Sequence, residues 1–142
     1  MLVRLLYASR AAKPLEAADV DSILAQSRAN NPKAGVTGVL CYSGDLFIQV
    51  LEGGRDAVCE LYNTIVRDGR HQSVRILSYE EISERRFGDW TMGHVNVARV
   101  NPTLLLKYSK KAELDPFSGS GKALMALLDE LIATAAVIGR CS

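Results

Sequence analysis

The sequence lacks the features that mark several classes of protein. Its three cysteines, Cys41, Cys59 and Cys141, are odd in number and do not have metal-ligand spacing, which argues against a zinc site or a disulfide framework. No apolar run reaches the roughly 18–20 residues of a membrane span. A formal net charge of +1 gives no electrostatic reason to expect nucleic-acid binding. We therefore expect a cytoplasmic protein without a membrane or nucleic-acid partner.

Other absences concern targeting and catalysis. The strand-like N-terminus leaves no place for a signal peptide. There is no Gly-rich dinucleotide fingerprint, no P-loop, no HExxH zinc motif and no cluster of cysteine and histidine. The two histidines, His71 and His94, lie far apart and suggest no catalytic triad. The sequence therefore predicts neither an enzyme nor a metal site.

What is present is a globular composition organised around one hairpin. With 142 residues, of which 48% are apolar, we expect one domain with a sizeable core. Two apolar runs, Val36–Tyr42 and Leu46–Leu51, flank the turn signal Ser43-Gly44-Asp45 and predict a β-hairpin.

Gln49 is the polar residue inside the second of these runs. A buried primary amide without partners costs about 1–3 kcal/mol, and it can donate twice and accept through its carbonyl. Two interpretations stay open from the residues alone. Either Gln49 bonds to neighbouring backbone or water, or it faces the polar edge of a ligand inside an apolar pocket.

Two helices are predicted from residues that recur with a 3.6-residue period. One face of the first helix, Glu16–Ala29, begins apolar and ends polar, with Val20, Ile23, Leu24, Ser27 and Asn31. The stripe of the second helix, Asp56–Arg67, contains Val58, Leu61, Tyr62, Ile65 and Val66.

The polar ends of these helices have two interpretations. Asn30-Asn31 before Pro32 fits a helix end, yet two adjacent amides could also bind a ligand that carries donors and acceptors. Arg70 and His71, which follow the second helix, fit a favourable interaction with its dipole.

The remaining segments complete an α+β domain. Three further strands are predicted at Leu2–Tyr7, Val74–Glu80 and Trp90–Val97. In the last strand, Trp90, Met92 and His94 are expected to share one face. The order β-α-β-β-α-β-β is that of a ferredoxin-like split βαβ sheet with one added strand and both helices on one face.

The C-terminal part is predicted to be helical. Pro102 begins a short helix through Lys107, and a Ser/Gly linker leads to a longer helix, Lys122–Ile138. The apolar stripe of that helix contains Leu124, Leu127, Leu128, Leu131, Ile132 and Ala135. It must be buried either on the open face of the sheet or against another subunit, as in a homo-oligomer.

Five short segments in order resemble the BLUF domain, a family of blue-light sensors that use FAD. They are LYAS at 6–9, NN at 30–31 with GVTGVL at 35–40, FIQVLEG at 47–53, DGRH at 68–71, and RRF at 85–87 leading to WTM at 90–92. The resemblance covers residues 1–97 and implies a sensor domain there. Residues 98–142 would be an output or oligomerisation extension, since they are too few for a cyclase or phosphodiesterase.

The resemblance implies non-covalent FAD held between the two helices. The polar edge of the flavin ring alternates acceptors with a donor, a pattern that an asparagine amide can match, so Asn31 would be the main contact. The cofactor-binding residues that it implies are Asn31, Asn30, Gln49, Arg70, His71, Asp68, Ser9, Ser27, Ile23, Phe47 and Ile65.

The resemblance also implies a reversible light reaction in which no substrate is converted. Tyr7 would give up an electron and a proton after excitation, and Gln49 would rearrange to produce a red-shifted signalling state. Trp90 or Met92 would relay this change to a separate effector protein, and which of the two faces the flavin stays open.

Two rival functions fit a small domain of this kind. One is an enzyme of the acylphosphatase type with Arg70 or Asn31 on a phosphate, although the chain has no phosphate-cradling loop. The other is a ligand-binding or structural interaction module without photochemistry. The presence of both Tyr7 and Gln49 argues against the second.

Overall fold

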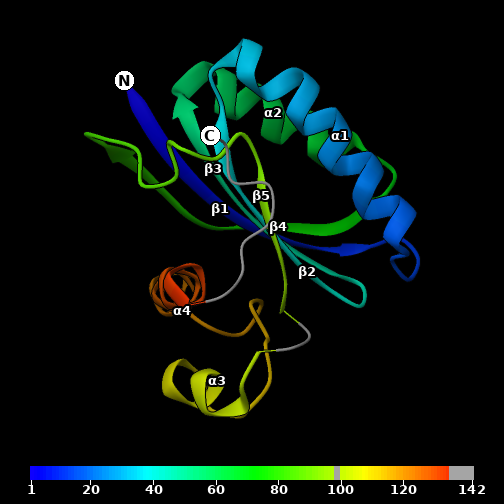
Figure 1. Ribbon diagram of the computed structural model, residues 1–142, viewed down its shortest axis with the longest axis vertical. Coiled ribbons are helices and arrows are strands. Elements are labelled where there is room, and N and C mark those ends of the chain that lie inside the picture. Colours follow the sequence, from blue (N-terminus) through cyan, green and yellow to red (C-terminus); the bar gives the residue numbers. More distant parts are fainter. Residues whose placement is uncertain (98–99, 135–142) are drawn as a thin grey trace.

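The predicted hairpin forms the centre of a five-stranded sheet in the computed structural model, which describes residues 1–97 and 100–134 (Figure 1). The elements in chain order are β1 Leu2–Ala11, α1 Ala17–Ala34, β2 Thr37–Ser43, β3 Leu46–Gly54, α2 Arg55–Arg67, β4 His71–Ile82, β5 Gly93–Asn96, α3 Pro102–Tyr108 and α4 Gly121–Thr134. This order confirms the α+β, ferredoxin-like arrangement with added C-terminal helices.

The pairing of the strands brings the two central candidate residues together. The strand order is β4-β1-β3-β2-β5, and β1 pairs antiparallel with both β3 and β4. In the β1–β3 ladder, Tyr7 lies directly opposite Gln49. Because directly opposed residues project from the same face of a sheet, both side chains lie on the face that α1 and α2 cover.

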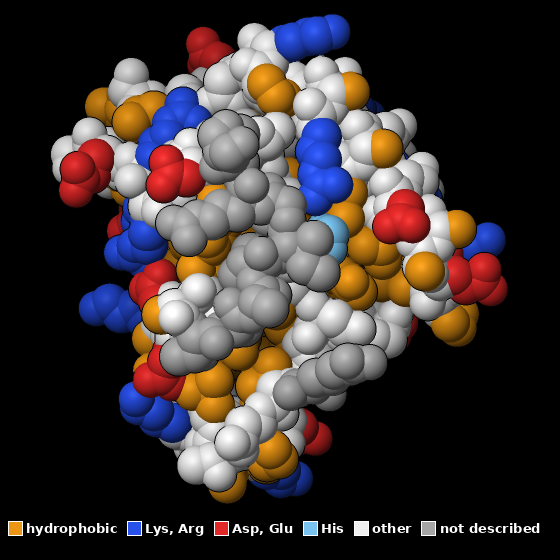
Figure 2. All heavy atoms as spheres, viewed as in Figure 1, with side chains coloured by type: hydrophobic (Ala, Val, Ile, Leu, Met, Phe, Trp, Pro, Cys, Tyr) orange, Lys and Arg blue, Asp and Glu red, His pale blue; other side chains and the backbone are white. Residues whose placement is uncertain are grey.

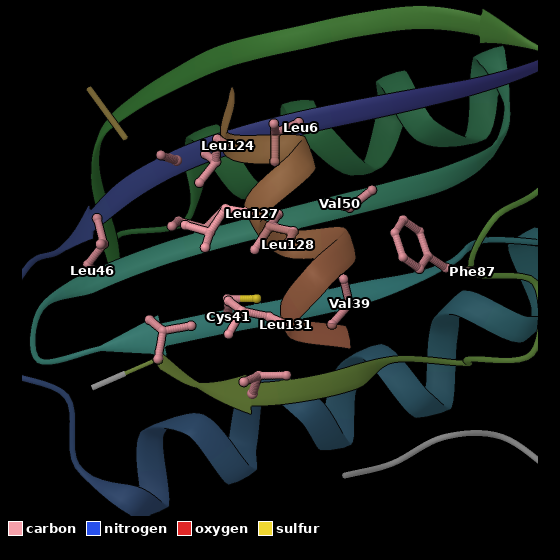
Figure 3. Close-up of a cluster of buried hydrophobic side chains, with 14 of the residues drawn as sticks. Leu6, Val39, Cys41, Leu46, Val50, Phe87, Leu124, Leu127, Leu128 and Leu131 are labelled. Atoms are coloured by element: carbon pink, nitrogen blue, oxygen red, sulfur yellow. The ribbon is translucent and has the colours of Figure 1, made fainter. Parts of the chain in front are cut away.

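The two faces of the sheet are covered by different helices. Figure 1 shows α1 and α2 on one face and α4 on the other. Alternate residues of the strands supply the two cores. Leu6, Val39 and Val50 pack with Leu127 and Leu128 of α4 in one cluster (Figure 3).

The apolar stripe of α4 therefore covers the chain's own sheet. This is the first of the two ways of burying the stripe that the sequence left open. Leu124, Leu127, Leu128 and Leu131 are each 6% exposed or less. The predicted end of this helix, residues 135–138 with Ala135, lies outside the described residues, as does Cys141.

The predicted end of the first helix at Ala29 is wrong. The helix continues to Ala34 with Pro32 inside its last turn, and it ends at Gly35, which has a φ of 72°. A proline so close to the end costs one backbone hydrogen bond, and Gly35 adopts the left-handed conformation without the penalty of a side chain. Asn30 and Asn31 consequently lie within the helix.

Two further predictions of shared faces are wrong. Trp90 packs in the α4-side cluster, whereas Met92 packs in the cluster beneath α1 and α2. The chain forms a strand only from Gly93 onward, so strand alternation does not apply to residues 90–92. On α2, Val66 is 47% exposed because the helix presents its flank to solvent there.

Candidate functional site

A cavity of about 190 Å³ lies between α1 and α2, above the centre of the sheet. Its walls come from both helices, from β1 to β3 and from the segment that follows α2. The lining residues are Tyr7, Ile23, Gln26, Ser27, Asn30, Asn31, Leu40, Gln49, Leu61, Thr64, Ile65, Asp68, Arg70 and His71. The structure thus brings together most of the site residues that the sequence predicted.

Tyr7 and Gln49 form a buried polar pair at the floor of this cavity. The Tyr7 hydroxyl donates a hydrogen bond to Gln49 Oε1, and Gln49 Nε2 lies 3.4 Å from Met92 Sδ. Tyr7 is 1% exposed and Gln49 is 5% exposed. Because a thioether sulfur is a weak acceptor, the amide nitrogen of Gln49 is held far less firmly than its carbonyl.

Burial also fixes the protonation state of the phenol. It raises the pKa of Tyr7 far above its ordinary value, and the nearby Tyr62 and Asp68 act in the same direction. Tyr7 is therefore a neutral hydrogen-bond donor throughout the physiological range.

Asn31 presents an unsatisfied donor in the same cavity. Its side chain belongs to a residue that is 3% exposed, and its Nδ2 has no hydrogen-bond partner among the described residues. A buried donor without a partner costs about 1–3 kcal/mol. An acceptor on a bound ligand would remove that cost, so the cavity fits a molecule with a carbonyl or ring nitrogen at its edge.

An ion pair lines the cavity next to α1. The Arg70 guanidinium donates to the Asp68 carboxylate, with Nη2 at 2.7 Å from Oδ2, and to Gln26 Oε1 of α1 at 2.7 Å. The hydrogen bonds from Arg70 hold the pKa of Asp68 below its ordinary value, although partial burial opposes them. Arg70 therefore links α1 to the segment after α2.

His71 is oriented by residues that lie behind the cavity wall. Ser9 Oγ is 2.8 Å from His71 Nδ1, and the Phe47 ring centroid is 4.6 Å from the His71 ring. Burial lowers the pKa of His71, with Asp68 opposing and Arg70 adding to the shift. Ser9 and Phe47, which the sequence placed at the ligand, thus support His71 and do not line the cavity.

The structure separates the two candidate relay residues. Met92 is fully buried beside Gln49, whereas the Trp90 ring lies tilted against the Phe87 ring on the α4 side, with 5.6 Å between the ring centroids. In this structure Met92 is the one of the two that contacts Gln49.

Four lining residues were missed by sequence reasoning. Leu40 lies opposite Gln49 in the β2–β3 ladder, so the register of the predicted hairpin could have identified it as a neighbour of Gln49. Gln26 lies one turn before Asn30, and Thr64 one turn after Leu61, as helical spacing would have shown. Leu61 was on the predicted stripe but was not assigned to a site.

A larger cavity, of about 280 Å³, lies where Tyr42 and His94 meet the start of α1. It contains neither the Tyr7–Gln49 pair nor the Asn31 amide, so it does not share the chemistry of the first. Among the described residues, no group of histidine, cysteine, aspartate and glutamate could hold a metal ion.

The family model of "sensors of blue-light using FAD" matches residues 2–93. The chain belongs to the BLUF family. Photoactivated adenylate cyclase subunit beta of Euglena longa is 36% identical over 92 residues, which are 64% of this chain and 11% of that protein. The chain thus spans about a tenth of the length of the curated relatives it matches.

Solved BLUF structures share the whole described fold. BlsA in its photo-activated state is 31% identical with a TM-score of 0.84, over 95% of this chain and 97% of BlsA. The dark state of BlrB, a BLUF protein, is 35% identical with a TM-score of 0.77, over 95% of this chain and 97% of BlrB. The matched part therefore has the fold of a family that is described as sensors of blue light using FAD.

Two further observations concern the molecule outside the cavity. Within residues 1–97 and 100–134, no helix is both long and apolar enough to cross a membrane. On the face shown in Figure 2, described basic and acidic side chains are interspersed and do not gather into one basic surface.

Proposed function

We propose that this protein is a blue-light photoreceptor that binds FAD non-covalently in the cavity between α1 and α2. The observation that carries the proposal is the buried Tyr7–Gln49 pair facing the unpartnered Asn31 amide in one cavity. BLUF membership supplies the cofactor class, since the family description names FAD.

The residues present fit a flavin ring. Asn31 Nδ2 would donate to its polar edge with Asn30 beside it, and Ile23 and Ile65 would form the apolar walls. Ser27 would lie beside the ring. A bound flavin would supply the absorption of blue light, while the protein supplies orientation, exclusion of water and the proton.

Arg70 would contact the part of the ligand that lies outside the ring. With Asp68 already bonded to it, the guanidinium is neutralised, so we expect the ring to dominate the affinity and the phosphates to add little. The same ion pair disfavours the acylphosphatase-type alternative, because that chemistry needs a cation free to hold a phosphate.

Tyr7 and Gln49 would form the switch. The phenol holds a proton that burial keeps in place, and its hydroxyl donates to Gln49 Oε1. Rotation or tautomerisation of the Gln49 amide would exchange the donor and acceptor that it presents to the cavity. Because the partner of its nitrogen among the described residues is Met92 Sδ, such a rearrangement breaks a weak contact there.

The output would pass from Met92 into β5, which begins one residue later. We propose residues 1–97 as the sensor and residues 98–142 as the extension that carries the signal to a separate effector protein. A homo-oligomer would use surfaces other than the α4 stripe, which is buried on the sheet. A reducing cytoplasm suits Cys41 and Cys59, which are free thiols.

Illumination of the purified protein tests the proposal. After loading with FAD, the sample should be yellow, and blue light should shift its visible absorption to longer wavelength, with full return in darkness. A colourless protein that takes up no flavin, or a loaded protein whose spectrum does not move, would overturn it.

A further inference from the structure

Glu52 is a fully buried carboxylate on the α4-side face of β3, three residues after Gln49. It accepts three hydrogen bonds. Arg4 Nε donates at 2.8 Å and the backbone N–H of Arg86 at 3.0 Å, both to Oε2, and the backbone N–H of Phe87 donates to Oε1 at 2.6 Å. Such charge-assisted bonds are the strongest that a buried carboxylate can make.

Two of these three donors belong to the segment that connects β4 to β5. Arg85 of the same segment donates to Gly35 O at 2.7 Å and to Thr37 Oγ1 at 3.0 Å. The segment is thus fastened to the ends of β2 and β3, and Glu52 is the anion at its centre.

The fastened segment leads by backbone contacts to the glutamine switch. Phe87 O accepts from Trp90 N at 3.1 Å, and Trp90 O accepts from Gly38 N at 3.1 Å. A Cβ at Gly38 would lie 2.0 Å from Val50 O, so the close packing of Gly38 against the backbone of β3 requires glycine. Two residues after Trp90, Met92 Sδ meets Gln49 Nε2.

The same segment also reaches α4. While the Arg86 backbone bonds to Glu52, its guanidinium donates to both carboxylate oxygens of Asp129 on α4, at 2.9 and 3.1 Å. An exposed ion pair such as Arg86–Asp129 contributes little stability by itself. The hydrogen bond from the Arg86 backbone N–H to the buried Glu52 carboxylate is stronger.

We propose that Glu52 is the positioning residue that holds Met92 against the amide of Gln49 and joins that contact to α4. It acts through the backbone of Arg86 and Phe87, and it touches neither the cavity nor Gln49. Only the illumination experiment on Glu52 rests on the proposed function, and the measurement in the dark does not.

Methionine methyl resonances offer a readout in the dark. The chain contains three methionines, Met1, Met92 and Met125, so ¹³C-methyl labelling resolves each one. We expect Glu52→Gln, which keeps the size but removes the charge and one acceptor, to move the Met92 methyl resonance and leave Met1 in place.

Glu80→Gln is the matched control. Glu80 is the second partner of Arg4, at 2.8 Å, but makes no bond to the segment. It should leave the Met92 resonance where it is. Arg86→Ala, which keeps the backbone N–H and removes the Asp129 pair, should do the same.

Light supplies a second readout. In flavin-loaded Glu52→Gln, the rate of dark recovery should change by about threefold or more, the effect of a net hydrogen-bond energy, while Glu80→Gln stays close to the unsubstituted protein. If Glu52→Gln does not fold, Glu52→Asp replaces it, because it keeps the charge but is one methylene shorter.

These measurements distinguish a failure of the Glu52 assignment from a failure of the proposed function. An unmoved Met92 resonance in the Glu52 variant, or an equal movement in Glu80→Gln, overturns the assignment of Glu52. Absence of any light response in the unsubstituted protein overturns the proposed function instead, and the dark measurement on Met92 still decides the role of Glu52.

Discussion

The two faces of the sheet differ although they are built from the same strands. On the α4 face, Leu6 and Val50 are buried in a cluster of apolar side chains (Figure 3). On the other face, their chain neighbours Tyr7 and Gln49 form a polar pair at the floor of a cavity. Strand alternation thus lets one hairpin stabilise the domain with one set of residues and hold a ligand with the other. Substitutions should separate the two roles.

The largest separation is expected at Gln49. Gln49→Leu should keep the flavin but abolish the light-induced red shift, because no amide remains to exchange donor and acceptor. The matched control is Ile48→Val on the opposite face, which should cost about 0.5–1.5 kcal/mol of stability and keep the shift. Light-minus-dark absorption spectra of both variants test this, and a normal shift in Gln49→Leu would remove that residue from its role.

Tyr7→Phe should likewise prevent the ordinary photocycle. The ring keeps its packing, including the Tyr62 ring at 5.9 Å, but the hydroxyl that donates to Gln49 is lost. Flash photolysis of the loaded variant should show no long-lived red-shifted species. Formation of that species at the usual yield would exclude Tyr7 as the proton source.

On the packed face the expected loss is in stability. Leu128→Ala should lower the free energy of unfolding by about 2–5 kcal/mol, because Leu128 is 1% exposed in the α4 cluster. Leu61→Ala should cost less, since Leu61 already borders open space. Urea unfolding of the flavin-free variants measures both, and equal losses would mean that the faces are packed alike.

Asn31→Ala should weaken flavin binding by up to about tenfold while changing the stability of the flavin-free protein little. The reason is that Asn31 Nδ2 has no partner among the described residues, so its removal breaks no bond there. Asn30→Ala, at an exposed neighbour, should affect binding less. Flavin titration followed by fluorescence gives both affinities.

The smallest effect concerns pH. Burial lowers the pKa of His71, so the folded protein binds its proton less readily than the unfolded chain. Stability should therefore fall as the pH drops below about 6.5, and the loss should level off below the folded-state pKa. His71→Gln should reduce this slope. His94→Gln should remove a separate share, because burial and then Arg28 lower the pKa of His94 as well.

The sequence could predict the parts of the fold that depend on periodicity. The hairpin, the buried stripe of α1 with Val20, Ile23, Leu24 and Asn31, and the order of the elements are confirmed. Gln49 could be identified because one polar residue within an apolar strand needs a partner. The resemblance named the partner Tyr7, and the β1–β3 register then placed it opposite.

Other parts depend on tertiary contacts that periodicity does not contain. Residues 90–92 read as strand, but they follow a segment fastened by Glu52 and do not alternate. Pro32 read as a helix terminator, although Gly35 one turn later is the residue that ends α1. Glu52 follows directly after the predicted strand Leu46–Leu51, and its burial becomes evident only from the three groups that donate to its carboxylate.

A crystal structure of the flavin-loaded protein in darkness tests the division of the two faces most directly. The ring should lie between α1 and α2, with its polar edge within hydrogen-bond distance of Asn31 Nδ2 and next to Gln49. A ring bound on the α4 face, or one held between the helices without contact to either amide, would contradict it.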